Sequence, residues 1–128
     1  MRANSVGKES VEARYAYVAG FIDGDGSIMA IIERHKEMRF GFRVRIVFKI
    51  TQKYRNYVSF LPELVGCGAI CRNGETYDWK TRDQKEVAKV LSLVQPYSRV
   101  KRRQIDLALK ILNTPIKSQQ DLMVVATL

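Results

Sequence analysis

The 128-residue sequence holds little of what a disulfide-bonded, zinc-binding or membrane-spanning protein needs. Its cysteines are Cys67 and Cys71 and its one histidine is His35, whereas a zinc site takes about four ligands. We therefore expect reduced, structural thiols in a cytosol-like compartment. No apolar run is long enough to span a bilayer, and the amino terminus lacks the pattern of a secretory leader. We expect an intracellular protein, of an organelle (chloroplast or mitochondrion) or of a prokaryotic cytoplasm, without membrane contact.

Acidic residues are also scarce. The 13 Asp and Glu stand against 22 Lys and Arg, which gives a net charge of +9 and a pI near 9.8. This excess indicates a polyanionic partner, so we expect a nucleic acid and no small-molecule substrate. The length suits one domain. We expect a disordered amino terminus over residues 1–7 and a single domain over residues 8–128.

The clearest pattern is the period-two alternation from residue 38 to residue 53, which predicts a long, half-buried strand. One face is apolar and the other is almost entirely cationic. Residues 34–55 hold eight Lys or Arg and one acid, a local charge of +7. Rows of like charge repel across a sheet, so a merely solubilising face is the weaker alternative. The pattern favours a sheet surface that lies in a nucleic-acid groove, where Arg and Lys contact phosphates and base edges.

A first strand is predicted over residues 27–36 and a hairpin over residues 69–73 and 76–81, with Asn73-Gly74 as its turn. Trp79 is expected to face the core. The residues predicted to contact nucleic acid alternate along these strands and are Ser27, Met29, Ile31, Glu33, His35, Arg39, Arg43, Arg45, Lys49, Lys53, Cys71, Asn73, Asp78 and Lys80.

Helices are predicted over residues 8–24, 54–65, 83–95 and 98–112, with a last short helix from Ser118 to Leu128. Pro62 implies a break or a late start in the second of these. The order α-β-β-α-β-β-α predicts an α+β fold, with helices on one face of an antiparallel sheet. Arg99, Lys101, Arg102 and Arg103 crowd the start of the helix over 98–112. They indicate an anion site, such as one for a DNA phosphate, or a solvated basic turn.

The first helix carries Ala16, Gly20 and Gly24 four residues apart, so these small residues share one face. Such a stripe allows a second helix to approach closely. The helix ends in Asp23 and Asp25, where negative charge opposes the helix dipole and a bound cation would offset that cost. Two solvated acids are the alternative. A calcium loop is disfavoured, because Ile28 and Arg34 stand where a glycine and a glutamate belong.

The stretch from Val18 to Gly26 resembles the signature of the LAGLIDADG homing endonucleases, and the predicted order of elements agrees with that family. The likeness covers residues 12–112 and is greatest to the single-motif, chloroplast-type members. It implies an αββαββα fold whose saddle-shaped sheet binds a long, pseudo-palindromic DNA duplex. It also implies a homodimer that pairs through Ala16, Gly20 and Gly24 and cuts both strands with Mg²⁺, for which Mn²⁺ or Ca²⁺ can substitute in vitro.

The same resemblance assigns roles to individual residues. Asp25 and the carbonyl of Gly24 are expected to bind the metal, Gln52 to order solvent at the cleaved phosphate, and Lys101 to approach it from the later helix. Either Arg55 or Lys53 fills a further basic position. Asp23 is expected to be a structural residue or to support the metal ligand without binding the metal. Two other functions stay open: a catalytically inactive binder of the same fold (an intron RNA maturase or a transcriptional regulator), and an unrelated basic sheet that binds RNA.

Overall fold

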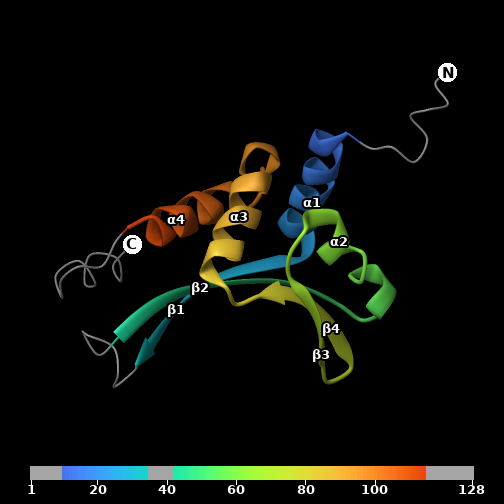
Figure 1. The fold of residues 1–128 in the computed structure, drawn as a ribbon, viewed down its shortest axis with the longest axis horizontal. Helices are drawn as coiled ribbons and strands as arrows, with labels where there is room; N and C mark the ends of the chain where they lie inside the picture. The colour runs from blue at the N-terminus through green and yellow to red at the C-terminus, as the bar shows by residue number, and fades with distance from the viewer. Residues whose placement is uncertain (1–9, 35–41, 115–128) are drawn as a thin grey trace.

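The computed structural model of the protein describes residues 10–34 and 42–114 (Figure 1). The predictions about residues 1–7, His35, Arg39 and the helix over 118–128 lie outside these ranges. Among the described residues, no helix has the length and apolar character needed to cross a membrane.

The chain begins with helix α1, Val11–Asp25, and passes without a loop into strand β1, Gly26–Arg34. Ser10 starts the helix, since its hydroxyl accepts a hydrogen bond from Ala13 N at 3.0 Å. At the junction a Cβ on Gly26 would lie 2.7 Å from the carbonyl oxygen of Ile22. Only glycine fits there, so the sequence fixes where the helix ends and the strand begins.

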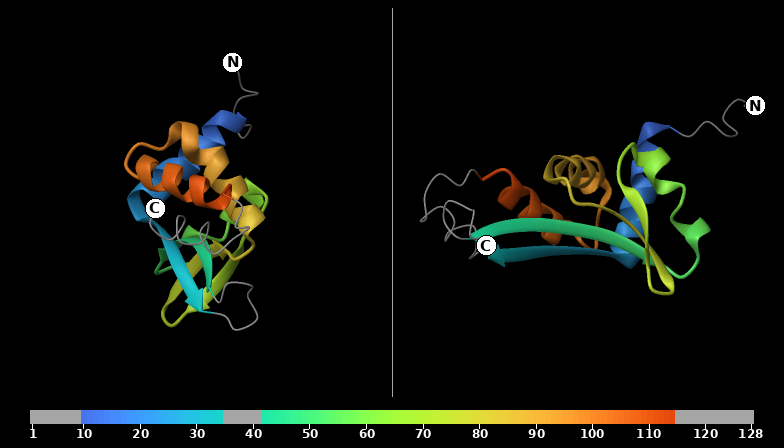
Figure 2. Two further views of the ribbon diagram at one scale, coloured as in Figure 1. Left: turned by 90° about the vertical axis from the view of Figure 1, so that its left-hand side faces the viewer. Right: turned by 60° about the horizontal axis from the view of Figure 1, so that its bottom comes forward.

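The sheet is antiparallel throughout, with strand order β1-β2-β4-β3. It contains β2 (Phe42–Gln52), β3 (Ala69–Asn73) and β4 (Thr76–Thr81). Strand β1 pairs with β2 along its whole length, whereas β4 pairs with β2 only between Phe48 and Gln52. The β1–β2 pair therefore continues past the hairpin as a long curved arm (Figure 2). The predicted hairpin turn is present, and Gly74 adopts φ +62° in it.

The connection after β2 confirms the predicted break at Pro62. A 3₁₀ turn, η2 (Arg55–Tyr57), is followed by a short helix α2 (Leu61–Val65), in which Pro62 occupies the first turn. Asp83 starts α3 (Gln84–Val94) as predicted, because its carboxylate accepts from Lys85 N. A 3₁₀ turn, η3 (Gln95–Tyr97), follows.

The last described helix, α4, spans Arg102–Leu112 and begins four residues later than predicted. Helices cover one face of the sheet (Figures 1 and 2). The core between them is continuous, and its largest fully buried side chains include Trp79, Phe48, Ile46 and Ile50 from the sheet. Trp79 packs edge-on against Phe48, with ring centroids 5.2 Å apart. The predicted α+β fold and αββαββα order are thus confirmed.

Candidate active site and nucleic-acid interface

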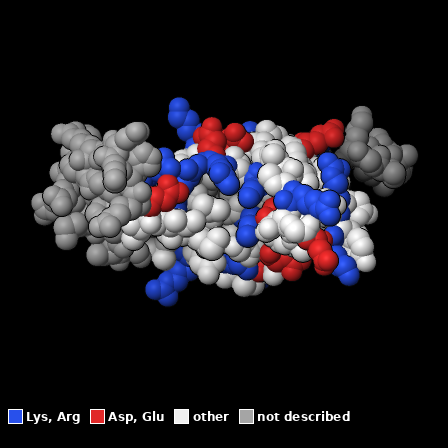
Figure 3. Space-filling view, turned by 90° about the horizontal axis from the view of Figure 1, so that it is seen from below, with Lys and Arg blue, Asp and Glu red and all other residues white. Residues whose placement is uncertain are grey.

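The second face of the sheet has no described helix over it and carries the alternating residues that the sequence pattern placed there. The strand register puts Ser27 opposite Lys49, Ile31 opposite Arg45, and Glu33 opposite Arg43. Lys49 also neighbours Lys80 on β4. Seen from below, this face shows Lys and Arg side chains with a few acids among them (Figure 3). We call it the open face.

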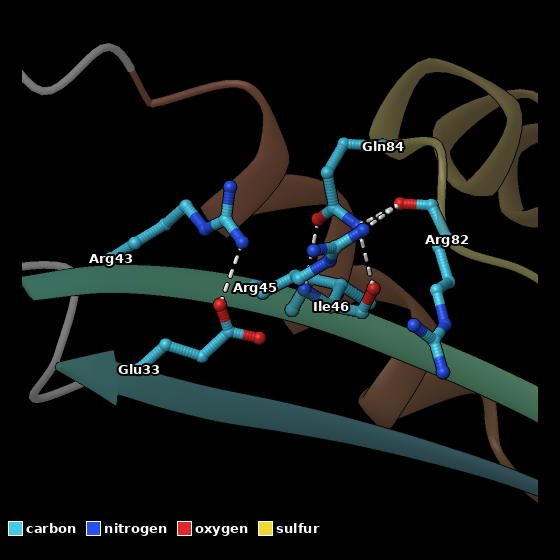
Figure 4. A network of polar contacts seen from close by, with 6 residues as sticks. All are labelled: Glu33, Arg43, Arg45, Ile46, Arg82 and Gln84. Carbon is cyan, nitrogen blue, oxygen red and sulfur yellow. Dashed lines mark hydrogen bonds and ion pairs between the residues drawn. The ribbon is translucent and has the colours of Figure 1, made fainter. Parts of the chain in front are cut away.

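Two arginines of the open face are engaged within the protein (Figure 4). Arg43 Nη2 lies 2.6 Å from Glu33 Oε2, and Arg45 Nη2 donates to the carbonyl oxygen of Arg82 at 2.6 Å. Arg45 lines a hollow of about 280 Å³ on this face, together with Ile31, Glu33, Val47, Lys80, Thr81 and Arg82. Sequence alternation predicted the face of Arg43 and Arg45 but gave no signal for these contacts, which join separate strands and loops.

The amide of Gln84 closes the edge of β2 where β4 ends (Figure 4). Its oxygen accepts from Ile46 N at 2.9 Å and its nitrogen donates to Ile46 O at 2.8 Å. A side chain thus takes the place of a neighbouring strand at this point, which satisfies both backbone groups.

Asp78 was predicted to contact nucleic acid, but the structure buries it. It lies on the open face, because it alternates with the buried Trp79, but its own side chain is covered and only 1% of the residue is exposed. Its carboxylate accepts from Thr51 Oγ1 at 2.5 Å and from Asn73 Nδ2 at 3.4 Å. Alternation tells which face a side chain is on, whereas the covering comes from neighbours on two other strands.

The end of α1 meets the end of β2. Because Gly26 pairs with Ile50 in the register, Gln52 reaches the last residue of the helix, and its Nε2 donates to Asp25 Oδ2 at 3.0 Å. Asp25 and Gly24 are exposed. The structure therefore brings together Asp25 and Gln52, two residues that sequence reasoning assigned to one site.

The Asp23 carboxylate points the other way, into the turn before α4. It accepts from Ser98 Oγ at 2.6 Å, from Arg99 N at 2.8 Å and from Lys101 N at 3.0 Å. Burial alone would raise the pKa of Asp23, but the bonds from Ser98 and from the backbone of this turn outweigh it and lower the pKa. The anion beside this basic turn is thus an internal carboxylate, and Asp23 holds the turn that carries Lys101.

The same contact explains why α4 starts late and where Lys101 lies. Residues 98–101 bind Asp23 instead of forming a helical turn. Lys101 Nζ donates to the carbonyl oxygen of Asp23 at 2.8 Å. Asp23 precedes Asp25 by two residues, so the ammonium group lies at the end of α1 that carries Asp25. Asp25, Gln52 and Lys101 therefore gather at one end of α1.

The two candidates for the further basic position line the same hollow, of about 630 Å³, beyond Gln52. Lys53 Nζ lies 5.7 Å from the ring centroid of Tyr54, and the hollow is completed by Arg55, Asn56, Ser59, Arg72, Glu75 and Tyr77. Lys53 follows the last residue of β2 and is not part of the strand.

The stripe of Ala16, Gly20 and Gly24 is exposed, and a Cβ added at either glycine would meet nothing within 4 Å. Tyr17 and Phe60 lie beside one another with ring centroids 6.2 Å apart, and they are 56% and 38% exposed. Nothing within the described protein requires glycine at these two helix positions.

Cys67 and Cys71 form no disulfide with each other. Burial, together with the nearby Glu86, raises the pKa of the Cys67 thiol, which suits a structural role.

Solved structures of DNA-bound homing endonucleases share this architecture, an open antiparallel sheet backed by helices. The structure of I-CvuI in complex with the I-CreI target matches with a TM-score of 0.82 and 25% identity, over 91% of this chain and 77% of that chain. The archaeal intron-encoded I-Vdi141I complexed with DNA also gives a TM-score of 0.82 at 25% identity, over 92% of this chain and 80% of that one.

The sequence model of the LAGLIDADG endonucleases matches residues 18–111, and the chain belongs to that family. Relatives include DNA endonuclease I-CreI of Chlamydomonas reinhardtii, 33% identical over 98 residues and 75% of this chain. DNA endonuclease I-CvuI of Chlorella vulgaris is 27% identical over 104 residues and 79% of this chain. The matched part of this chain spans 60% and 65% of the length of these two relatives.

Proposed function

We propose that the protein is a site-specific DNA endonuclease that acts as a homodimer, depends on a divalent cation, and hydrolyses both strands of a long, pseudo-palindromic duplex. The observation that carries this proposal is the contact of Gln52 with Asp25 at the end of α1, beside Lys101. A protein that only binds nucleic acid has no need of an acid, an amide and an ammonium group together at one point. The family of the chain and its DNA-bound structural relatives agree with the proposal.

The open face supports duplex DNA as the substrate. Arg45 and Lys49 of the long β1–β2 pair and Lys80 of β4 lie on this face. The major groove admits a two-stranded β-ribbon, and a cationic side chain at every second residue can neutralise phosphates or contact guanine. Within the described strands, the aromatic rings of Phe48 and Trp79 are buried in the core, whereas the stacking platform typical of proteins that bind single-stranded RNA exposes its rings.

The residues present fit a magnesium site that needs DNA to complete it. Within residues 10–34 and 42–114, no three Cys, His, Asp or Glu side chains cluster, so a protomer alone does not offer a complete metal site. Mg²⁺ is commonly held by one or two carboxylates together with substrate phosphates. Asp25 and the carbonyl of Gly24 would hold it, with Mn²⁺ or Ca²⁺ as substitutes. When bound, such a cation polarises the phosphoryl group and lowers the pKa of a water.

The protein's own groups have separate tasks around that position. The Gln52 amide holds one carboxylate oxygen of Asp25 and leaves its own carbonyl to orient a water. The ammonium group of Lys101 supplies positive charge for the phosphate, as does Arg55 or Lys53 from the adjoining hollow. Asp23 fixes the turn that carries Lys101 and takes no part in the chemistry.

A homodimer supplies a second copy of Asp25. The stripe of Ala16, Gly20 and Gly24 allows two α1 helices to pack closely about a two-fold axis. Both helices then deliver their ends to neighbouring phosphates on opposite strands, which accounts for cleavage of both strands and for a nearly palindromic site.

The test starts from selection of cleaved sites in a random duplex library with Mg²⁺. The variant Asp25→Asn keeps the size of the side chain and its capacity to accept from Gln52, but it weakens the metal ligand. We expect it to lose cleavage by at least ~100-fold while it binds the selected duplex as the wild type does. Glu63→Gln, which removes one exposed acid from α2, is the matched control and should cut normally.

Two outcomes would contradict the proposal. If Asp25→Asn still cut with Mg²⁺ at the wild-type rate, Asp25 would not be the metal ligand. If the wild-type protein bound selected duplexes but cut none with Mg²⁺ or Mn²⁺, the protein would be a catalytically inactive nucleic-acid binder instead.

A further inference from the structure

Asp78 is the one aspartate or glutamate among the described residues that is buried, and it lies in the middle of the open face. It has β2 on one side and β3 on the other, with Thr51 directly opposite on β2 and Cys71 directly opposite on β3. Within residues 10–34 and 42–114, no Lys or Arg makes an ion pair with it. Burial of a carboxylate without a cation is unfavourable, so its neutral partners must hold it.

Those partners are a hydroxyl and an amide. Both partners act as donors, and each turns a hydrogen toward a carboxylate oxygen of Asp78. Thr51 Oγ1 therefore directs its single hydrogen to Asp78 Oδ1, across 2.5 Å. Asn73 turns its Nδ2 to Asp78 Oδ2, across 3.4 Å, which directs the amide oxygen of Asn73 away from the carboxylate.

The consequence for Thr51 is a fixed hydrogen-bonding direction. A free threonine hydroxyl can donate or accept, as its hydrogen rotates to suit the partner. Here the hydrogen is committed, and the partly exposed Thr51 can offer only a lone pair to a ligand on the open face. Asn73, which is exposed, likewise has its oxygen available on that face.

We infer that Asp78 is a specificity-determining residue that makes Thr51 an obligate hydrogen-bond acceptor toward DNA; this inference rests on the proposed function. In the major groove only cytosine N4 and adenine N6 donate, whereas guanine and thymine present acceptors at the corresponding positions. Thr51 therefore selects an amino-bearing base, C or A, at the base pair that it contacts.

The neighbouring rung of the sheet has the opposite character. Lys49 and Lys80 are opposite one another in the register, two residues from Thr51 and Asp78 on the same face, and ammonium groups can only donate. Thus the open face places donors and an enforced acceptor side by side. A base-pair step that offers acceptors to the lysines and a donor to Thr51 differs from a step that offers acceptors alone. Asp78 creates this requirement, because it fixes the hydroxyl of Thr51 as an acceptor.

The test compares base preferences, position by position, from selection of cleaved duplexes with wild-type protein and with Asp78→Asn. The amide at position 78 can donate to Thr51, which frees the hydroxyl hydrogen to point at the groove. We expect the preference for C or A to fall about tenfold, to near indifference, at one symmetry-related pair of positions, with all other positions unchanged. Thr51→Val, which removes the hydroxyl at nearly constant volume, should relax the same pair of positions and keeps the test possible if Asp78→Asn does not fold.

Asp106→Asn is the matched control, because it removes an exposed acid from α4 and should leave every preference unchanged. If Asp78→Asn and Thr51→Val lowered stability or cleavage equally for all duplexes, Asp78 would be a structural residue and the inference would be overturned. If the wild-type protein selected no duplex at all, the proposed endonuclease function would fail as well. If the wild-type protein showed the preference and both variants retained it, only the inference about Asp78 would be overturned.

Discussion

Gln52 and Asp25 lie 27 positions apart in the sequence, yet the Gln52 amide nitrogen is 3.0 Å from Asp25 Oδ2. The contact exists because α1 passes directly into β1, and β2 returns antiparallel along it until Gln52 is level with the end of the helix. An exposed carboxylate with a hydrogen-bond donor on one oxygen is held in a preferred orientation while its other oxygen stays available.

The first prediction concerns this contact. Gln52→Ala should reduce the rate of DNA cleavage by at least ~10-fold while binding of the duplex changes by less than ~3-fold, since one hydrogen bond to a charged group contributes about 1.5–3 kcal/mol. Single-turnover cleavage and equilibrium binding in Ca²⁺ separate the two effects. Gln95 provides a matched control, because its amide also donates to an exposed aspartate, Asp106, at 2.7 Å. Equal loss of cleavage in Gln95→Ala would show that the effect is not specific to the site.

The second prediction concerns the small-residue stripe of α1. Gly20→Leu should prevent dimerisation without unfolding the protomer, because a side chain at Gly20 meets nothing within the protein but fills the space that a second helix needs. Sedimentation velocity should show a monomer with an unchanged circular dichroism spectrum. Arg14→Leu puts the same side chain on an exposed position away from the stripe and should remain dimeric. A dimeric Gly20→Leu protein would contradict the role of the stripe.

Much of the fold was predictable because it depends on local rules. Period-two alternation assigned Arg43, Arg45 and Lys49 to one face of β2, and strand geometry makes that assignment nearly automatic. Pro62 and the Asn73-Gly74 turn act within a few residues and were placed correctly. The helix expected from residue 98 failed because Asp23, 75 residues earlier, binds Ser98 and the backbone that follows it.

The members of the candidate site remain predictions, and the contacts among them could not be read from the sequence. Family resemblance named Asp25, Gln52 and Lys101, and the structure gathers them at one end of α1. The covering of Asp78 depends on partners from β2 and β3, and the bond from Arg45 to Arg82 joins two distant segments. No local pattern in the sequence encodes such contacts.

The third prediction concerns the packing of Gly68 against Trp79. Gly68 has φ +89°, and a Cβ there would lie 2.4 Å from Trp79 Nε1, which donates to Cys67 O. Gly68→Ala should therefore lower the free energy of unfolding by roughly 3 kcal/mol or more, as measured by urea denaturation. Gly74→Ala is the control, because its φ is also positive but its Cβ would meet nothing, so only about 1 kcal/mol is expected. Similar losses for both variants would show that backbone strain, and not the contact with Trp79, determines the effect.

The fourth prediction concerns pH. Burial disfavours ionisation of Asp23, but the hydrogen bonds from Ser98, Arg99 and Lys101 outweigh it, so its pKa is lower in the folded protein than in the unfolded chain. The unfolded state then takes up the proton first, and stability from this group is present above the unfolded pKa of about 3.9 and lost as pH falls through the lower folded pKa. Asp23→Asn also replaces one acceptor oxygen by a donor facing Arg99 N. At pH 7 we expect it to be less stable than the wild type by about 2 kcal/mol.

Urea denaturation between pH 2 and pH 7 measures this difference directly. The gap between wild type and Asp23→Asn should be constant above pH ~5 and should narrow below pH ~4, because only the wild type loses stability by protonation of residue 23. Glu63→Gln is the control, because it removes one exposed acid from α2 and leaves the turn before α4 untouched. A gap that stayed constant down to pH 2 would mean that the Asp23 carboxylate contributes through its shape alone, and its hydrogen bonds to the turn before α4 would not depend on its charge.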